Sequence, residues 1–373
     1  MNVSVMQENL ARGLAVVSRA VSTRATLPVL ANVLLKTENA GLKLTATNLE
    51  IGITCWVPGK VEAEGEITVP ARLLTDLVAS LPNQRIDLVL SPRDRTLKVT
   101  CGGSRSSIKG IDADEFPVVA AIGEDPVTSV DARALREALS EVVFAAATDE
   151  SRPILTGVLT KLSGSTMTLA AADNYRIAVR EVQLARPVSP EQTIVVPARS
   201  YSELMRILPD SDTAIDITVT PNKSQVLFHV DETDLVSRLI EGQFPNYEPV
   251  IPTSHTSRAV VDREAFLAGT RRAQIFARDS ANIVKVEVGG DGQGISITAH
   301  AADVGENADQ LDATVEGQPT TIAFNARYLT DVLSALNAAE AALELSGPLA
   351  PGVIRGVGKD DYVHVIMPVR TAS

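Results

Sequence analysis

The fold of this chain is decided by a phrase that occurs three times: ITVPARLLTDLVASLP at 67–82, IVVPARSYSELMRILP at 194–209 and IAFNARYLTDVLSALN at 322–337. Its arginines, Arg72, Arg199 and Arg327, are 127 and 128 residues apart. This spacing is far longer than the unit of a solenoid repeat and close to the length of one domain. The sequence therefore predicts three related domains.

Domain boundaries are expected after two Phe-Pro pairs, Phe116-Pro117 and Phe244-Pro245. The segments that follow them, 118–128 and 246–257, are rich in proline and lack a clear period. Such segments are typical of linkers. The predicted domains are 1–125, 126–253 and 254–373.

Each domain is expected to contain two halves of the form βαβββ. After Arg72, apolar residues recur at helical spacing up to Leu81, and Pro82 ends the helix. Two β-rich runs around a polar turn follow, and then SRSSIKG as a further strand. The same order recurs along the chain, with a turn at 163–165 between two strands of the second domain. The pattern predicts an α+β fold with helices over 6–21, 72–81, 131–146, 199–208, 262–277 and 326–337.

The composition is that of a globular protein. Apolar residues make up 45% and charged residues 21% of the chain, which is enough to bury several cores. No apolar run is long enough to span a membrane, and the N-terminus lacks the features of a secretion signal, so we expect a cytoplasmic protein. Cys55 and Cys101 lie in apolar, strand-like runs and are interpreted as buried thiols.

The net charge of −12 argues against a nucleic-acid partner, and an aromatic content of 3% disfavours single-strand binding by base stacking. The basic residues are unevenly placed, however. The six predicted helices carry eleven arginines and no lysine against nine carboxylates, so the strands and loops hold the acidic excess. A helix layer gathered on one side could then face a polyanion. The alternative is that these are ordinary solvated helix faces.

Signatures of catalysis are absent from the sequence. The four histidines are scattered singly, without the companions of a metal site. GGDGQG at 289–294 joins two strands and does not open a helix, so it is interpreted as a hairpin turn and not a phosphate loop. The carboxylate clusters at 112–115 and 360–361 lie in turns and are typical of solvated charge. We expect no enzyme activity, no metal and no cofactor.

A triple repeat of paired βαβββ units, with arginine-bearing helices and no catalytic constellation, resembles the bacterial sliding clamp family, the beta subunits of DNA polymerase III. The resemblance covers essentially the whole chain. Its most specific stretches are RATLPVLANVLL at 24–35, the 67–82 phrase, DNYRI at 173–177, EGQFPNYEPVIP at 241–252 and VIMPVR at 365–370.

The resemblance implies a head-to-tail homodimer that closes a ring of six similar domains, with helices lining the hole and antiparallel sheets outside. Double-stranded DNA passes through the hole without sequence readout. The implied partners are the polymerase catalytic subunit, the clamp loader, repair polymerases and other proteins with clamp-binding peptides. By position, the implied DNA-contacting residues are Arg24, Arg72, Arg152 and Arg199.

A peptide-binding pocket between the second and third domains is also implied. The matching residues are Leu155, Ala172, Tyr175, Arg176, Ile177, Pro245, Val250, Leu349, Val365, Ile366, Met367, Pro368 and Val369. The family usually has Gly-His-Arg where Asn174-Tyr175-Arg176 stands, which bears on peptide preference. The residues at 365–367 would also serve as an ordinary core strand.

For ring closure, Ile108 of one chain and Ile275 with Phe276 of the other match the apolar subunit contact of the family. Ser106 stands where an aromatic is often found, so this interface is expected to be smaller or more polar. The tail 371–373 also extends slightly past the usual end of the family.

Two rival functions come from other classes. One is a repeat scaffold that binds proteins but does not encircle DNA. The other is a carboxylate-dependent hydrolase, which a nuclease or phosphatase assay with Mg²⁺ would detect.

Overall fold

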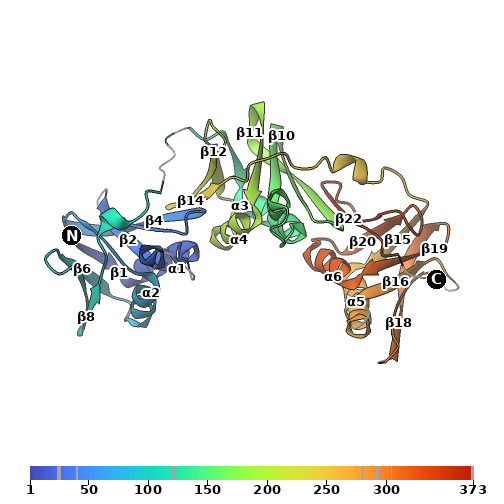
Figure 1. Cartoon of the computed structure of the whole chain (residues 1–373), viewed down its shortest axis with the longest axis horizontal. Helices are drawn as coiled ribbons and strands as arrows, with labels where there is room; N and C mark the ends of the chain where they lie inside the picture. The colour runs from blue at the N-terminus through green and yellow to red at the C-terminus, as the bar shows by residue number, and fades with distance from the viewer. Residues whose placement is uncertain are drawn as a thin grey trace. The chain divides into compact units, whose positions relative to one another are not determined.

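The computed structural model describes residues 1–22, 27–38, 41–119, 123, 125–278, 281–290, 294–303 and 305–370. The chain forms two compact units (Figure 1). The first contains Met1–Ala132 and Arg206–Leu239, and the second contains Arg133–Met205 and Ile240–Ser373. Each unit includes part of the expected central domain, and the expected domain boundaries stay a prediction.

The first unit contains two βαβββ segments followed by strands of the central repeat. Its helices are α1 (Gln7–Val17) and α2 (Ala71–Ser80). Its strands are β1 (Asn2–Met6), β2 (Asn32–Glu38), β3 (Gly41–Thr47), β4 (Ile51–Ala63), β5 (Glu66–Pro70), β6 (Arg85–Ser91), β7 (Thr96–Cys101), β8 (Ser104–Lys109), β9 (Thr128–Asp131), β12 (Ala214–Val219), β13 (Gln225–Val230) and β14 (Thr233–Arg238).

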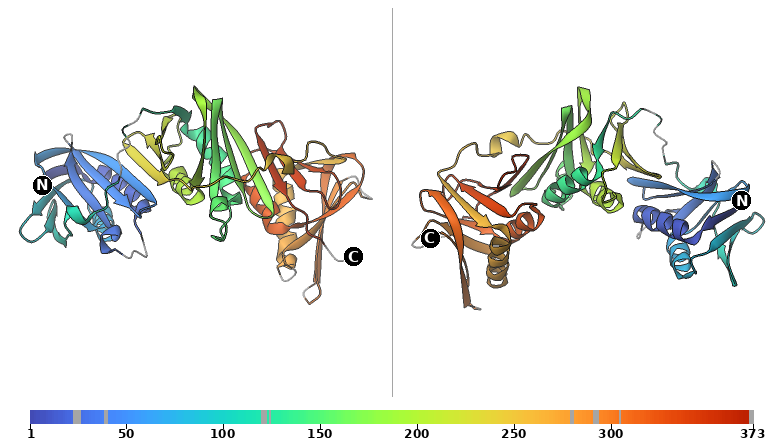
Figure 2. Two further views of the ribbon diagram at one scale, coloured as in Figure 1. Left: turned by 45° about the horizontal axis from the view of Figure 1, so that its top comes forward. Right: turned by 180° about the vertical axis from the view of Figure 1, so that it is seen from behind.

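These strands form one antiparallel sheet in the order β8-β7-β6-β1-β4-β14-β13-β12-β9, with β2, β3 and β5 off this path. Helices α1 and α2 lie side by side against it (Figures 1 and 2). Leu10, Leu14 and Val17 form the buried stripe of α1. Gly13 lets the helix approach β4, because a Cβ there would lie 2.9 Å from Cγ2 of Val57.

The second unit contains the remaining helices: α3 (Ala132–Val142), α4 (Ala198–Ile207), α5 (Arg263–Ala277) and α6 (Ala326–Ala335), of which α3 and α4 each have one end in the first unit. Its strands are β10 (Gly157–Ala172), β11 (Arg176–Pro197), β15 (Ser257–Asp262), β16 (Ile283–Val288), β17 (Gly294–Ala301), β18 (Gly305–Gly317), β19 (Thr320–Asn325), β20 (Glu340–Leu345), β21 (Gly352–Gly356) and β22 (Tyr362–Ile366).

The sheet of the second unit runs β10-β11-β22-β21-β20-β15-β18-β17-β16-β19 and is also antiparallel. Helices α5 and α6 pack against each other, and α5 lies on β17 and β18 (Figure 2). The pairing of β11 with β22 joins the central repeat to the last one. This junction positions the candidate site.

All six expected helices are present, and the α+β class is confirmed. Two of the helices end four residues earlier than predicted. Helix α1 ends at Val17 and tightens into a 3₁₀ turn at Ser18–Ala20, and α3 ends at Val142 before a 3₁₀ turn at Val143–Ala145. Val142 has φ −118°, because consecutive β-branched residues fit the α-helix less well than the extended backbone. None of the described helices is long and apolar enough to cross a membrane.

The turn expected at 163–165 lies within β10 at a change of register. Residues 157–162 pair with 192–197 of β11, and residues 166–172 pair with 177–183. Gly164 lies between the two blocks with φ +54°, a conformation that favours glycine. The prediction located the irregularity correctly, but the structure assigns both blocks to one long strand.

Candidate functional site

A cavity of about 330 Å³ opens in the second unit where the ends of three strands meet. Its walls come from the β10–β11 turn, from the end of β22 and from the segment that begins at Phe244. The lining residues are Arg152, Leu155, Ala172, Asp173, Asn174, Arg176, Ile177, Phe244, Pro245, Asn246, Tyr247, Val250, Val365 and Met367. Its volume lies at the small end of the range of ligand pockets.

The floor of the cavity is a hydrophobic cluster. Ile177 pairs directly with Val365 across β11 and β22, and both belong to a buried group with Leu155 and Phe244. Strand alternation decides which neighbours reach the cavity. Val365 and Met367 line it, whereas Ile366 points to the opposite face of the sheet and is fully buried in the core.

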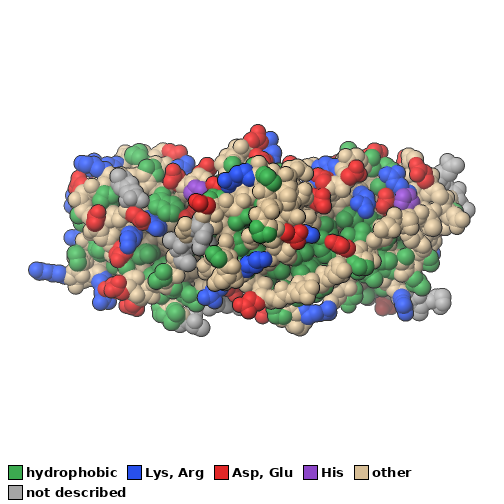
Figure 3. All heavy atoms as spheres, turned by 90° about the horizontal axis from the view of Figure 1, so that it is seen from above, with side chains coloured by type: hydrophobic (Ala, Val, Ile, Leu, Met, Phe, Trp, Pro, Cys, Tyr) green, Lys and Arg blue, Asp and Glu red, His purple; other side chains and the backbone are tan. Residues whose placement is uncertain are grey.

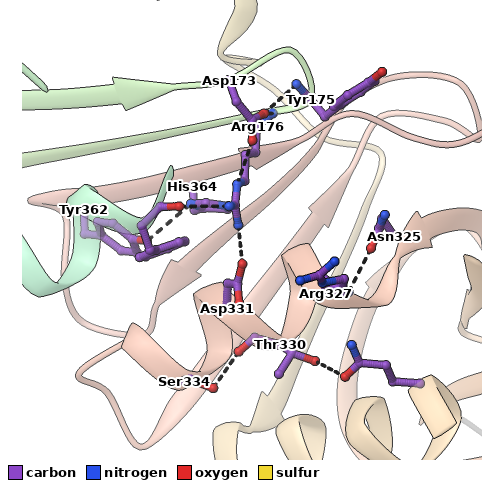
Figure 4. A network of polar contacts seen from close by, with 12 residues as sticks. Asp173, Tyr175, Arg176, Asn325, Arg327, Thr330, Asp331, Ser334, Tyr362 and His364 are labelled. Atoms are coloured by element: carbon purple, nitrogen blue, oxygen red, sulfur yellow. Dashed lines mark hydrogen bonds and ion pairs between the residues drawn. The ribbon is translucent and has the colours of Figure 1, made fainter. Parts of the chain in front are cut away.

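Arg176 holds the turn at the edge of the cavity in place (Figure 4). Its Nε donates to Asp173 Oδ2 at 3.1 Å, its Nη1 to Asp331 Oδ2 at 2.6 Å and its Nη2 to the carbonyl of Phe144 at 2.8 Å. The guanidinium also lies 4.6 Å from the ring centroid of Tyr328. With three bonds already made and little exposure, Arg176 shapes the cavity more than it offers a free cation.

Asp173 organises the backbone of the same turn. Its Oδ1 accepts from the amides of Tyr175, at 2.7 Å, and Arg176, at 3.0 Å. Tyr175 is exposed and stacks on Tyr328 of α6 with ring centroids 6.1 Å apart. Burial raises the pKa of Tyr328, as does the nearby Asp173.

Eight of the thirteen residues predicted for this pocket line the cavity: Leu155, Ala172, Arg176, Ile177, Pro245, Val250, Val365 and Met367. The other five do not: Tyr175 faces Tyr328, Ile366 is in the core, Leu349 is exposed in the loop before β21, and Pro368 and Val369 follow the strand end. The amide of Val369 donates to Ala323 O at 2.8 Å. Their role in binding stays a prediction.

Sequence reasoning missed Asp173, Asn174, Phe244, Asn246 and Tyr247 as lining residues. The signals are present in the sequence, because all five residues lie in the family stretches DNYRI and EGQFPNYEPVIP, but within these stretches the prediction of the pocket names only Tyr175, Arg176, Ile177, Pro245 and Val250. Arg152, expected to contact DNA, lies on this cavity.

The other arginines expected at DNA are exposed in the structure. Arg72 projects from the first turn of α2 with 96% of its side chain accessible, and its Nε lies 3.8 Å from Asp76 Oδ2. Arg199, in the first turn of α4, is exposed as well. Arg24 lies outside the described residues. Their contact with DNA stays a prediction.

The residues expected at the subunit contact differ in exposure. Ile275 on α5 is an exposed large hydrophobic, and Phe276 beside it is half-buried. Ile108 on β8 is only 4% exposed because it packs within its own unit. Its side chain therefore offers little surface to a second copy, whereas the backbone edge of β8 stays available. The tail 371–373 lies outside the described residues.

The face of the molecule in Figure 3 mixes both signs of charge, with hydrophobic side chains gathered between them. Among the described residues, no group of three or more His, Cys, Asp or Glu side chains could hold a metal.

The apolar floor and polar rim of the cavity suit binding of a short chain segment, with its apolar side chains on the floor.

Comparison with known proteins gives the same family along the whole chain. Models of the N-terminal, central and C-terminal domains of the DNA polymerase III beta subunit match residues 1–120, 129–246 and 248–370. The beta sliding clamp of Synechococcus elongatus is 34% identical over 98% of both chains. That of Staphylococcus aureus is 30% identical over 95% of both chains.

Solved structures agree. The DNA polymerase sliding clamp from Bacillus subtilis superimposes with a TM-score of 0.95 at 29% identity, covering 100% of both chains. The DNA polymerase III beta subunit from Pseudomonas aeruginosa gives 0.92 at 29% identity, covering 99% of this chain and 100% of the other. Three consecutive domain matches and relatives aligned from end to end lead to one conclusion: this chain belongs to the DNA polymerase III beta subunit, or beta sliding clamp, family.

Proposed function

We propose that this chain is a DNA sliding clamp, a non-catalytic processivity factor that closes around duplex DNA as a homodimeric ring. Family membership along the whole chain supports this function and does not favour a scaffold without encirclement. The observation that supports ring closure is a strand pairing between neighbouring repeats. It occurs twice in the chain, and among the described residues the strands for a third pairing do not pair with each other.

The two junctions present in the chain are built from corresponding strands. β4 ends the first βαβββ half of the first repeat and pairs with β14, which ends the second half of the next. In the same way, β11 of the central repeat pairs with β22, the last strand of the third. Both pairings are antiparallel and cover five residues: 51–55 with 233–237, and 176–180 with 362–366.

Within the part of the chain that the structure describes, both strands of the third junction are present but do not pair with each other. By correspondence this junction would join β18, the end of the first half of the third repeat, to β8, the end of the second half of the first. Among the described strands, β8 pairs only with β7, and residues 305–312 of β18 pair only with β17. Exposed strand edges of this kind favour pairing with another chain. Two copies placed head to tail would complete two such junctions and close the ring.

The register of this third pairing follows from the strands beside it. Ala313 of β18 pairs with Val261, the residue before the end of β15, as Gly59 of β4 pairs with Val5 in β1. Residues 305–309 therefore correspond to 51–55. On β8, Ser104 follows its tight turn as Thr233 does on β14. We expect 104–108 of one copy to pair with 305–309 of the other, which keeps core-facing side chains on one face.

DNA contact in this proposal is weak and independent of sequence. Exposed arginines such as Arg72 and Arg199, together with Arg24, attract phosphates without reading bases. Because the closed ring keeps the protein on DNA, affinity is not needed for retention, and weak contacts let the ring slide. The net charge of −12 is compatible with this role, because the fields of distant acids are screened within about 8 Å at physiological salt.

The cavity in the second unit is the proposed receptor for short peptides of the polymerase, the clamp loader and repair proteins. Met367 and the aliphatic lining can repack around different apolar anchors, which suits a shared receptor. A replication factor of this kind would work in the cytoplasm and needs no cofactor.

Retention on DNA of different topology tests the function. After loading by an ATP-driven loader, the protein should stay on nicked circular duplex through gel filtration in high salt and be lost when the circle is cut. Equal retention on both forms would mean ordinary surface binding and would contradict encirclement.

A further inference from the structure

A second hollow, of about 420 Å³, lies in the first unit beside the other Phe-Pro pair. Its lining residues are Leu34, Lys36, Lys43, Thr45, Thr54, Trp56, Glu66, Ala113, Phe116, Pro117, Val118, Val119, Leu227, Asp234 and Val236. They come from β2 to β5, from β13 and β14, and from the segment after β8. We name this site the Trp56 hollow.

The Trp56 hollow and the cavity of the second unit have corresponding walls. Phe116 is 7% exposed and Phe244 is 8% exposed, so each Phe-Pro pair anchors its segment by a buried ring. Val236 of β14 pairs with Gly52 of β4, as Val365 of β22 pairs with Ile177 of β11. Each valine lines its own site. The repeat has thus built one type of hollow at two strand junctions.

The two sites lie at different places along their strands, and one difference in sequence between the repeats accounts for this. Ile177 occupies the position that Gly52 has in the first unit, and a Cβ on Gly52 would lie 2.7 Å from Cγ1 of Val119. The segment after Phe116 therefore packs directly on β4. The open space lies further along β3 and β4, towards Lys43 and Trp56, so the two sites differ in lining.

The charged side chains around the Trp56 hollow already have partners. Lys36 lies 3.0 Å from Glu66, Lys43 lies 3.1 Å from Glu38, and Asp234 lies 2.6 Å from His229. The Lys43 ammonium also lies 5.0 Å from the Trp56 ring centroid. A ligand held by charge would have to displace these pairs, so the walls favour an uncharged, apolar anchor.

Val118 adds the apolar surface for such an anchor. It is 95% exposed, although the neighbouring Phe116 is buried. The side chain stands at the rim of a hollow that contains Trp56, Leu227 and Val236. Covering such apolar surface with an apolar side chain of a partner is favourable, because it removes the surface from water.

From these observations we infer that the Trp56 hollow is a second peptide-docking site, which takes a short partner segment through one uncharged aliphatic or aromatic side chain set against Val118 and Trp56. The inference rests on the proposed function, because the corresponding cavity of the second unit is the proposed peptide receptor. A clamp with both sites would hold two partner segments per chain.

Trp56 provides a direct test because it is the only tryptophan of the chain. The full-length protein, labelled with 5-fluorotryptophan and methyl-¹³C methionine, gives one ¹⁹F signal for the hollow and a Met367 signal for the cavity, assigned with Met367→Leu. The probe is the capped tetrapeptide Ser-Leu-Phe-Ser, with capped Ser-Gly-Gly-Ser as the inert control. We expect the ¹⁹F signal to shift saturably with the first probe only.

Two matched variants assign the effect, because each follows its own Phe-Pro pair and removes an exposed valine. Val118→Asp should weaken the ¹⁹F titration by about tenfold, as expected for loss of one apolar contact, while Val250→Asp should leave it unchanged. Val118→Leu, which keeps an apolar side chain, should bind the probe as the wild type does.

The two signals separate failure of the inference from failure of the proposed receptor. Movement of the Met367 signal alone overturns the second site and leaves the proposed receptor standing. Movement of the Trp56 signal alone supports the second site and contradicts the cavity, and movement of neither overturns both. A ¹⁹F shift that survives Val118→Asp unchanged also overturns the inference.

Discussion

Arg176 is the residue on which the shape of the cavity depends most. Its side chain joins the β10–β11 turn, through Asp173, to α6, through Asp331, and to the carbonyl of Phe144. The guanidinium makes these bonds from three separate nitrogens in a rigid plane, a geometry that the single nitrogen of a lysine ammonium cannot reproduce. The same guanidinium lies over the ring of Tyr328, and Tyr328 also stacks with Tyr175.

Removing Arg176 should destabilise the second unit. Arg176→Ala leaves the Phe144 carbonyl and two carboxylates without their partner, so we expect a loss of about 2–4 kcal/mol in the free energy of unfolding. Urea denaturation followed by far-UV circular dichroism measures it. Arg176→Lys should recover less than half. As the control, Arg72→Ala removes an exposed i,i+4 contact and should cost no more than about 0.5 kcal/mol; equal losses would refute the structural role.

His364 makes the stability of the second unit depend on pH. It is fully buried, stacks on Phe144 at 5.5 Å between ring centroids and lies 3.4 Å from the Tyr362 hydroxyl. Burial, with a smaller contribution from Arg176, lowers the pKa of His364 to about 3. The unfolded chain takes up this proton at a pKa of about 6.5. The contribution of neutral His364 to the free energy of unfolding should therefore be present above pH 6.5 and be lost progressively as the pH decreases towards 3.

The expected loss between pH 6.5 and pH 5 is about 1.6 kcal/mol, because the unfolded imidazole is half protonated at pH 6.5 and almost fully protonated at pH 5. Denaturation at both pH values, in wild type and in His364→Phe, measures the difference. The phenylalanine keeps the stacking and removes the titration, so the pH dependence should shrink by that amount. Replacing the exposed His255 by alanine is the control for the removal of a histidine from the surface of the same unit. A slope unaltered in His364→Phe would exclude this source.

At the scale of elements, local patterns predicted the order of helices and strands because each repeat supplies its own periodicity. They failed where tertiary contacts decide. The merging of two strands into β10 depends on pairing with β11, which no local window contains. The same limit applies to the site: Val365 and Ile366 are both apolar, and only the register of β22 determines that the first lines the cavity.

Helix starts offer a prediction at this scale. The third copy of the repeated phrase has Asn325 where the others have proline, and its side chain accepts from the amide of Arg327 at 2.9 Å. Asp262 caps α5 in the same manner, through Ala265 N at 2.8 Å. Asp262→Ala should cost about 1 kcal/mol in urea denaturation, whereas Asp262→Asn, which keeps an acceptor, should cost little. Equal losses would show that charge, not capping, stabilises this helix start.

At the scale of the whole molecule, the sequence predicts three repeats. The strand pairing between repeats, which only the structure reveals, is what indicates how two copies would close a ring. Both junctions within the chain use the same strand positions, so the third should have the same register. Ser107 of one copy then lies opposite Glu306 of the other, on the face away from the core. Cysteines at paired positions of adjacent strands lie within disulfide reach.

The double variant Ser107→Cys with Glu306→Cys should therefore form covalent dimers on mild oxidation, seen on a non-reducing gel. The natural cysteines, Cys55 and Cys101, are both buried and should not compete. Ser107→Cys with Gln310→Cys is the matched control, because four residues along a strand move the thiol about 13 Å away. Bonding in the control but not in the designed pair would overturn the register.

Closing the ring covalently also separates encirclement from adhesion. If the Ser107/Glu306 cysteine pair is oxidised after loading onto nicked circular duplex, the protein should stay on the circle in salt that screens every arginine–phosphate contact, because topology does not depend on charge. If it is oxidised before loading, the sealed ring cannot admit a circle and none should be retained. Reduction should restore loading in the second case. Retention by a ring sealed in advance would require a surface that binds DNA from outside, and the clamp proposal would then be wrong.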